Sequence, residues 1–525
     1  MKLYRAFFTV GGLTLLSRIM GFLRDILAAA VLGTGPVADA FYVAFRFPNL
    51  FRRLFGEGAF NSAFVPLFAS KFEGEGPEQA RAFASQAMSG LAFVLILLSA
   101  VAMIAMPWLM YLLAPGFSGT PDKFELAVRL TQITFPYLLC MSLVALMSGV
   151  LNTVGRFAES SSVSIVLNAV LTISMLISIW FGFKAEPAAG YIQAWAVFVA
   201  GFLQLALLMW GLQRAGLTLK IGRPRWTDDM KKLVALGVPG VIAGGITQVN
   251  IAIGTVIASL QDGAISHLYY ADRLYELPLA IVGIAIGVVL LPDVSRHLRA
   301  GNHTAVMDSQ NRSLEFAMLL TVPAAVALVI VPTEIVRVLF ERGAFTATDT
   351  PYTAEALRIF ALGLPAFVLI KVFSPAFFAR QDTRTPMRFA VWSLTANTLG
   401  SVGLFFLFRH LGWMPHLGIA VATTLGGWMN ALLLYRGLKS HGHFESDARL
   451  RRALPRILLS AVVMGAALIA AAYGLDPWLN QAQGFVVRFT ALAVLVGVGF
   501  VAYFAATQLT GAATFGQLRS AVGRK

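Results

Sequence analysis

Ionisable residues interrupt several of the most apolar stretches of the sequence, where a charged side chain is costly and usually faces a cavity or a partner. They concentrate in three stretches, and the cation in each is arginine. The planar guanidinium forms bidentate contacts with phosphate that a lysine ammonium cannot form. The pattern therefore predicts a polar pocket for an anionic substrate such as a phosphate or a pyrophosphate. The candidate residues are Arg18, Arg24 and Asp25, then Asp39, Arg46, Asn49, Arg52, Arg53 and Glu57, and then Asp272, Arg273 and Glu276.

The second of these stretches predicts a helix with one polar face. At about 100° per residue, four of its charged residues fall within roughly 40° of one another, so they must line a polar interior and not face lipid. Pro48 is expected to kink this helix, and the angles cannot be carried across a kink. The helical wheel therefore leaves open whether Arg52 or Arg53 faces the pocket. The polar face consists of Asp39, Arg46, Arg53 and Glu57.

Structural ion pairs are the alternative explanation of these charges. Arg273 can reach Glu276 three residues further along a helix. A purely structural core, however, would be more stable with apolar residues at these positions. We therefore expect ion pairs within the set, and a binding role for the set as a whole.

Membrane-spanning helices are the elements that must position these residues. The chain of 525 residues is 58% hydrophobic and 13% charged, whereas a soluble protein averages about 25% charged residues. Because a helix needs about 20 mostly apolar residues to cross a bilayer, we expect an all-α polytopic membrane protein with about fourteen transmembrane helices. The expected spans are 7–33, 37–66, 84–113, 126–151, 159–183, 190–213, 233–259, 265–294, 312–333, 352–378, 387–409, 416–436, 454–474 and 485–509.

The distribution of lysine and arginine predicts the orientation of these spans. The net charge is +15, and the loops on the side of the two termini carry most of the basic residues, including the clusters Lys220–Arg225 and Arg449–Arg456. By the positive-inside rule both termini of this multi-pass protein are cytoplasmic. The basic excess is then explained by topology and by anionic lipid headgroups, which argues against a nucleic-acid partner. No cleavable signal peptide is expected, because Arg18 and Arg24 interrupt the first apolar stretch.

An internal repeat organises the expected spans. Landmark residues of the first half recur in the second half about 226 residues later. Six spans separate the members of each pair, so the repeat predicts two parallel six-helix lobes around a central cleft, followed by two C-terminal helices. Chance agreement between two hydropathy profiles is the alternative. The expected domains are 1–228, 229–440 and 441–525. The recurring pairs include Gly11 and Gly237, Arg46 and Arg273, Pro66 and Pro292, and Asn168 and Asn397.

Motifs of an enzyme or of a metal centre are absent from the sequence. It contains no G-x-S-x-G, no Walker loop and no aspartate-rich loop, and its seven histidines and single cysteine, Cys140, lack metal-ligand spacing. We therefore expect a protein that is not an enzyme and has no cofactor.

A cation-coupled exporter and a membrane-embedded glycosyltransferase are the rival functional classes. A mainly acidic cleft would favour an exporter of organic cations, and an acidic metal-binding loop would favour the transferase. Four residues could hold a monovalent cation, although polar contacts between helices explain them equally well: Asn397, Thr398, Thr423 and Thr424.

Long strings of this sequence resemble the bacterial lipid II flippase family, MurJ, also called MviN. The likeness runs from the start of the chain to about residue 440 and thins in the last two spans. The resemblance implies the fold of the multidrug/oligosaccharidyl-lipid/polysaccharide exporter (MOP) superfamily. The matching strings are Ser17–Asp25, Asp39–Arg53, Glu57–Phe60, Ala114–Phe117, Asn152–Thr153, Tyr269–Leu274 and Arg380–Pro386.

The same resemblance implies a function and roles for the candidate residues. It implies a flippase that moves lipid II, the lipid-linked peptidoglycan precursor, from the cytoplasmic to the periplasmic leaflet for cell-wall synthesis and cell shape. Its partners would be lipid II, the membrane and proteins of cell-wall synthesis; a flippase for another polyprenyl-pyrophosphate glycan, differing only in the headgroup, is the nearest alternative. The last two spans would form a groove for the polyprenyl tail. The resemblance favours Arg52 over Arg53, since it associates transport with arginines matching Arg18, Arg24, Arg52 and Arg273 and places acidic residues matching Asp25, Asp39 and Glu57 in the same region.

Overall fold

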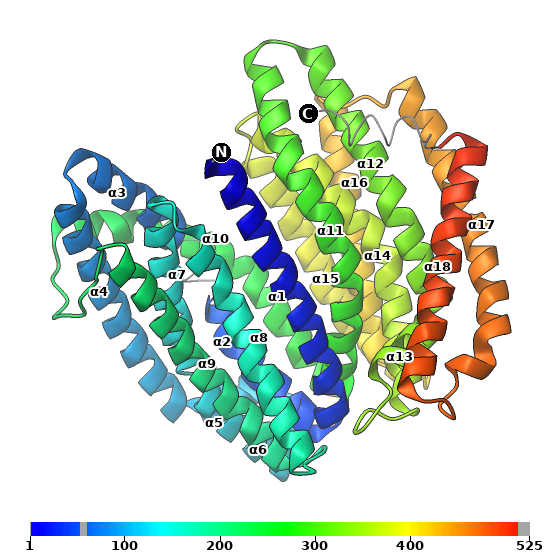
Figure 1. The fold of residues 1–525 in the computed structure, drawn as a ribbon, viewed down its shortest axis with the longest axis horizontal. Helices are drawn as coiled ribbons and strands as arrows, with labels where there is room; N and C mark the ends of the chain where they lie inside the picture. Colours follow the sequence, from blue (N-terminus) through cyan, green and yellow to red (C-terminus); the bar gives the residue numbers. More distant parts are fainter. Residues whose placement is uncertain (1, 53–59, 513–525) are drawn as a thin grey trace. The chain divides into compact units, whose positions relative to one another are not determined.

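The computed structural model describes residues 2–52 and 60–512, and within them the chain is helical almost throughout (Figure 1). These residues form no β-strand, only an isolated bridge between Arg342 and Phe345. The expected all-α fold is confirmed. The first helices are α1 (Lys2–Leu32), α2 (Pro36–Arg52), α3 (Phe60–Gly74), α4 (Pro77–Ile104), α5 (Met106–Leu113), the 3-10 helix Pro115–Gly119, α6 (Pro121–Thr134), α7 (Tyr137–Thr153), α8 (Phe157–Trp180), α9 (Pro187–Arg214) and α10 (Asp228–Ala258). They are followed by α11 (Ala264–Arg299), α12 (His303–Ile330), α13 (Pro332–Phe340), α14 (Asp349–Phe378), α15 (Arg384–His410), α16 (His416–Ser440), α17 (Ala448–Leu479) and α18 (Phe485–Thr510).

Ten helical segments in the described residues are long and apolar enough to cross a membrane, counting α6 and α7 together. They coincide with ten of the expected spans, and the other four expected spans coincide with α1, α2 and α3 taken together, α10 and α11. The helices α1 and α11 have ample length, 31 and 36 residues, and both carry the ionisable residues singled out above. A multi-pass membrane protein is therefore the fold class, and the polar spans are those that hold the candidate site.

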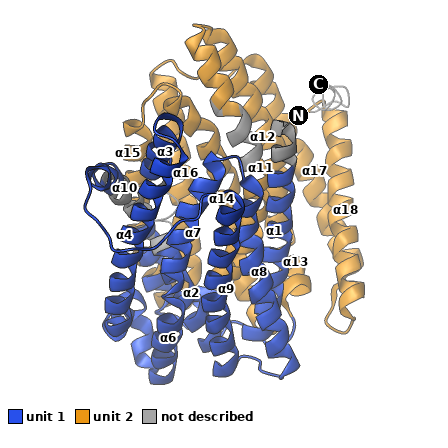
Figure 2. Cartoon of the chain, turned by 60° about the vertical axis from the view of Figure 1, so that its left-hand side comes forward, with its two compact units in different colours: residues 1–266, 342–345 blue, residues 267–341, 346–525 orange. Residues whose placement is uncertain are grey.

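The chain divides into two compact units, residues 1–266 with 342–345 and residues 267–341 with 346–525 (Figure 2). In unit 1, α1 lies along α8, α8 packs on α9, and α2 packs on α6. In unit 2, α14 packs on α12 and α16, α15 on α16, and α17 lies between α12 and α18. Both units are therefore bundles of neighbouring helices that bury apolar faces against one another.

The compact units are divided at a different place from the boundary expected at residue 228. Helix α10, expected in the second lobe, packs on α3, α4 and α5 and belongs to unit 1. Residues 441–525 do not form a unit of their own, because Leu450 and Ile457 of α17 share one hydrophobic cluster with Val306 and Leu314 of α12. The two repeated lobes stay a prediction from the sequence.

Residues 342–345 form a short loop that belongs to unit 1, although unit 2 precedes and follows it in the sequence. The loop contacts the end of α1. The amide of Ala344 donates to the carbonyl oxygen of Ala30 at 2.8 Å. Gly343 has a φ of +61°, and a Cβ at this position would lie 2.3 Å from the same oxygen. Only glycine combines this backbone conformation with so close an approach.

Candidate functional site

The first part of the candidate site lies on α1, where Arg24 and Asp25 form an ion pair. Nε and Nη2 of Arg24 donate to one oxygen of Asp25 at 3.0 and 2.6 Å. Nη1 of Arg24 donates at 3.0 Å to the side-chain oxygen of Asn168 on α8, whose own amide donates to the carbonyl oxygen of Ser17 at 2.8 Å. A Cβ on Gly21 would lie 3.3 Å from the Asn168 amide, so a small residue here lets α8 approach α1. Asn168 therefore fixes the direction of the Arg24 guanidinium, a role that the sequence did not indicate.

Arg18 lies on α1 outside this network. It precedes Arg24 by six residues, which places it about 120° away around a regular helix, and its side chain is exposed. The structure thus brings Arg24, Asp25 and Asn168 together, and it leaves Arg18 on another face of α1.

The carboxylate of Asp39, near the start of α2, is completely buried and accepts four hydrogen bonds. Its donors are Lys123 Nζ at 2.8 Å, the amide of Gly263 at 2.8 Å, and the amide and hydroxyl of Ser266 at 3.1 and 2.8 Å. Lys123 Nζ also contacts Asp262 at 2.9 Å and lies 4.3 Å from the centre of the Phe117 ring. In this structure Asp39 fastens the turn between α10 and α11 to α2 and α6. The helical wheel predicted that Asp39 lines a polar pocket, whereas in this structure its carboxylate faces these buried donors.

Lys123 contacts the candidate site residue Asp39, but it was not predicted from the sequence. Its neighbours Asp122 and Glu125 and its place at the start of α6 are typical of a solvent-exposed helix end, yet the residue is only 2% exposed. Its burial depends on segments 84 and 139 residues away in the sequence, those of Asp39 and Asp262. Local sequence carries no signal for such a contact.

The remainder of α2 holds the other polar residues of the predicted face. Arg46 donates through Nη1 to the hydroxyl of Thr255 at 3.3 Å, and Asn49 donates to the carbonyl oxygen of Phe45 at 2.7 Å. The helix continues through Pro48 and is described as far as Arg52. The side chain of Arg52, and all of Arg53 and Glu57, lie outside the described residues.

The third part of the candidate site is in unit 2, on α11. Arg273 Nη1 contacts Glu276 Oε2 at 3.0 Å, as the spacing predicted, and the guanidinium carbon lies 4.9 Å from the centre of the Tyr269 ring. The two charged side chains are 33% and 43% exposed. This pair is open enough for Arg273 to exchange its carboxylate partner for an anionic ligand.

The candidate cation ligands lie on α15 and α16. The side-chain oxygen of Asn397 accepts from Ser401 at 3.3 Å and from Thr423 at 3.4 Å, and Thr424 donates to the carbonyl oxygen of Ile359 at 2.9 Å. The bond from Ser401 lies within α15, and the other two join α16 to α15 and to α14. Within the described residues, no group of three or more histidine, cysteine or acidic side chains could hold a metal ion.

A helical bundle with charged residues in its spans defines a class of protein, the polytopic membrane transporters. The fold agrees with a solved inward-facing MATE-family multidrug transporter of the MOP superfamily, at a TM-score of 0.64 over 81% of this chain and 95% of that one; with 14% identity, this likeness shows the fold alone. A second solved structure, "Lipid II flippase MurJ, inward closed conformation", has a TM-score of 0.75 and 25% identity over 95% of this chain and 98% of that one.

The family within this class is identified by sequence. The family model described as "Lipid II flippase MurJ" matches residues 28–494. A Rhizobium meliloti protein named "Probable lipid II flippase MurJ" is 46% identical over all of this chain and 97% of its own length. The "Lipid II flippase MurJ" of Burkholderia cenocepacia is 34% identical over 96% of both chains. The chain belongs to the MurJ family.

Proposed function

We propose that this protein is a flippase that carries lipid II from the cytoplasmic to the periplasmic leaflet of the bacterial inner membrane for cell-wall synthesis. Family membership supports this substrate. The observation that carries the proposal is that arginines at positions singled out within the expected spans, Arg24 and Arg273, each contact a carboxylate, which an anionic ligand can replace as a partner of the guanidinium. A pyrophosphate matches guanidinium groups in charge and geometry.

The proposed mechanism is alternating access driven by the membrane potential. Arg24, Arg52 and Arg273 bind the pyrophosphate while the site is open to the cytoplasm, and release it when the site opens to the periplasm. Moving one charge across the membrane is worth roughly 2.3 kcal/mol per 100 mV. With the interior negative, a substrate carrying about two negative charges would gain roughly 4–5 kcal/mol on moving outward, which needs no nucleotide hydrolysis.

The polyprenyl tail is proposed to remain in lipid beside α17 and α18. Large apolar side chains are exposed on both helices, for example Val462 at 65%, Tyr473 at 88% and Phe500 at 72%. Such faces suit either acyl chains or a polyprenyl chain, so the tail need not cross a polar region. Residues 441–525 would then lie beside the tail, as the resemblance to the family implies.

Coupling to a monovalent cation is a second proposal, with the side-chain oxygens of Asn397, Thr398, Thr423 and Thr424 as the candidate ligands. Thr423 donates to the side-chain oxygen of Asn397 at 3.4 Å, so two of these oxygens lie close together. Replacing sodium by a large organic cation should then slow transport, whereas an Asn397→Ala variant should be insensitive to the replacement.

Transport by the purified full chain in vesicles tests the main proposal. We expect lipid II to be translocated faster than other polyprenyl-pyrophosphate glycans, and we expect the rate to fall when the potential is collapsed. Arg273→Ala should abolish translocation, whereas Arg129→Ala, which removes an exposed arginine paired with Glu125 on α6, is the matched control and should leave it unchanged. Full activity of Arg273→Ala, or a clear preference for another glycan, would refute the proposal.

Labelling of introduced cysteines from either side of the membrane tests the proposed orientation. Both termini and the segment Leu217–Lys232 should react from the cytoplasm, and the segment between α17 and α18 should react from the periplasm. The reverse pattern would contradict the orientation independently of the substrate.

A further inference from the structure

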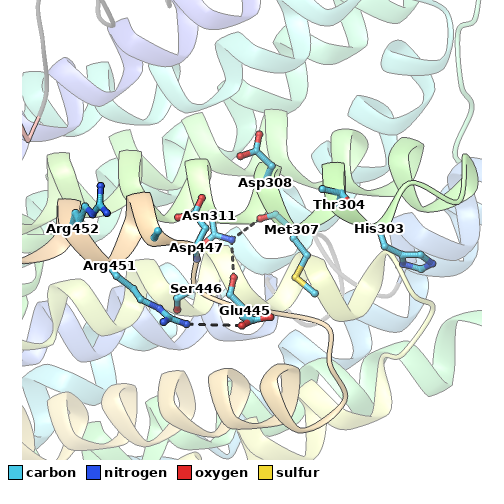
Figure 3. Close-up of a pocket in the computed structure, with 11 residues that line it drawn as sticks. His303, Thr304, Met307, Asp308, Asn311, Glu445, Ser446, Asp447, Arg451 and Arg452 are labelled. Atoms are coloured by element: carbon cyan, nitrogen blue, oxygen red, sulfur yellow. Dashed lines mark hydrogen bonds and ion pairs between the residues drawn. The ribbon is translucent and has the colours of Figure 1, made fainter.

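A pocket of about 840 Å³ lies in unit 2, remote in sequence from the candidate substrate residues, where the start of α12 meets the segment that leads into α17 (Figure 3). Asn311, only 1% exposed, builds its floor. Its amide donates to the carbonyl oxygens of Met307 and Glu445 at 2.8 Å, and its oxygen accepts from the amide of Asp447 at 3.2 Å. The segment is thus fastened to α12 by a buried side chain, and the pocket is a built feature of the fold.

The pocket is lined by both acidic and basic side chains. Several of these side chains make only long contacts with their ion-pair partners. Asp308 is 68% exposed and lies 3.4 Å from Arg312, and Glu445 is 83% exposed and lies 4.0 Å from Arg451. Arg452 is exposed and, within the part of the chain that the structure describes, has no hydrogen-bond or ion-pair partner. Two carboxylates and two guanidinium groups are therefore available to one ligand.

The spans expected from the sequence put the pocket at the depth of lipid headgroups. The expected spans begin at residue 312 in α12 and at residue 454 in α17, and a helix rises 1.5 Å per residue. Asp308 and Arg452 are then about 6 and 3 Å outside the hydrocarbon core. The headgroup layer on each side of a bilayer is roughly 5–7 Å thick, so both residues lie within it.

We propose that this pocket binds the headgroup of a phospholipid that carries a primary ammonium, a phosphoethanolamine. The phosphate would contact Arg451 and Arg452, and the ammonium would donate to Asp308 and Glu445. A headgroup with a glycerol instead offers nothing to the carboxylates, and a choline headgroup carries the positive charge but has no N–H to donate. The pocket therefore distinguishes among lipids by hydrogen bonding as well as by charge.

Native mass spectrometry of the detergent-purified full chain tests this proposal. Phosphatidylethanolamine, phosphatidylcholine and phosphatidylglycerol with identical acyl chains are each added at the same concentration. We expect several-fold more bound phosphatidylethanolamine than phosphatidylcholine. Asp308→Asn combined with Glu445→Gln should bring that ratio close to one, and Arg452→Gln should weaken the binding of both zwitterionic lipids.

Controls keep the outcome unambiguous. Glu78→Gln removes an exposed acidic residue at the start of α4 and should leave the lipid ratio unchanged. All the substituted side chains are exposed, so thermal unfolding should match that of the unchanged protein. Equal binding of the two zwitterionic lipids, a preference that survives the double substitution, or stronger binding of phosphatidylglycerol that Arg452→Gln removes would each overturn the proposal.

Discussion

Removal of the Lys123 ammonium should destabilise the protein strongly, because this cation is buried against a buried carboxylate. The two side chains are 1% and 0% exposed, and they are 2.8 Å apart. Losing one partner of a buried ion pair costs about 3–5 kcal/mol. In Lys123→Met, Asp39 retains three donors from Gly263 and Ser266, which moderates the loss, so we expect about 3 kcal/mol. At about 2 °C per kcal/mol for a unit of this size, residues 1–266 with 342–345, the Tm should fall by roughly 5 °C.

The assay is thermal unfolding of the detergent-purified protein, carried out as a double-mutant cycle. Adding Asp39→Asn to Lys123→Met removes the uncompensated charge and should recover at least about 1 kcal/mol. Lys71→Met is the matched control, since Lys71 pairs at 3.1 Å with Asp229, which is 45% exposed; that substitution should cost less than about 1 kcal/mol. A loss at Lys123 no greater than at Lys71, or no recovery in the double variant, would refute the reasoning.

The same variants separate a structural role of Asp39 from a role in binding substrate. If the carboxylate only fastens the turn between α10 and α11, the double variant should transport lipid II once its fold is restored. A well-folded double variant without transport would show that the Asp39 carboxylate or the Lys123 ammonium acts in the transport cycle itself.

Three further predictions concern single residues. Gly116→Ala should lower the Tm by several degrees, because its Cβ would lie 2.1 Å from a backbone carbonyl oxygen, whereas Gly119→Ala in the same 3-10 helix meets nothing within 4 Å and should be neutral in the same melt. Asn168→Asp should slow lipid II transport more than Asn168→Ala, because a second carboxylate would compete with the substrate for Arg24; an unchanged rate in vesicles would contradict this. A backbone amide that donates to Asp382 holds the pKa of this carboxyl below its ordinary value of 3.8, so its contribution to stability is present above that pH and is lost as the pH falls through the lowered pKa; Asp382→Asn should therefore lower the Tm at pH 7, and by less as the pH falls below 3.8.

Local pairings were predictable from the sequence, and distant ones were not. The bond of Arg273 with Glu276 joins residues three positions apart, so helix geometry alone predicts it, whereas Arg24 and Asp25 are adjacent and regular helix geometry does not predict their contact. Hydropathy likewise predicted the all-α membrane fold, because about 20 apolar residues suffice to mark a span.

The partners of Asp39 and Arg24 across the fold needed the structure. Asn168 reaches Arg24 over 144 residues and Lys123 reaches Asp39 over 84 residues, distances over which no periodicity extends. The helical wheel groups Asp39 with other charged residues, but it cannot tell whether this carboxylate meets a pocket or a buried lysine. Such a choice depends on which helices become neighbours, and single spans carry no information on that.

The two described arginine pairs differ in how easily a substrate can open them. The pair of Arg273 with Glu276 is about one-third to two-fifths exposed, so its partners are exchanged at a cost of about 1 kcal/mol or less. Arg24 and Asp25 are 13% and 6% exposed, and removing the guanidinium would take two hydrogen bonds from a buried carboxylate. Loss of transport in Arg24→Ala would therefore mix misfolding with lost binding. Arg24→Ala combined with Asp25→Asn isolates the binding contribution, because the buried charge is removed together with its partner.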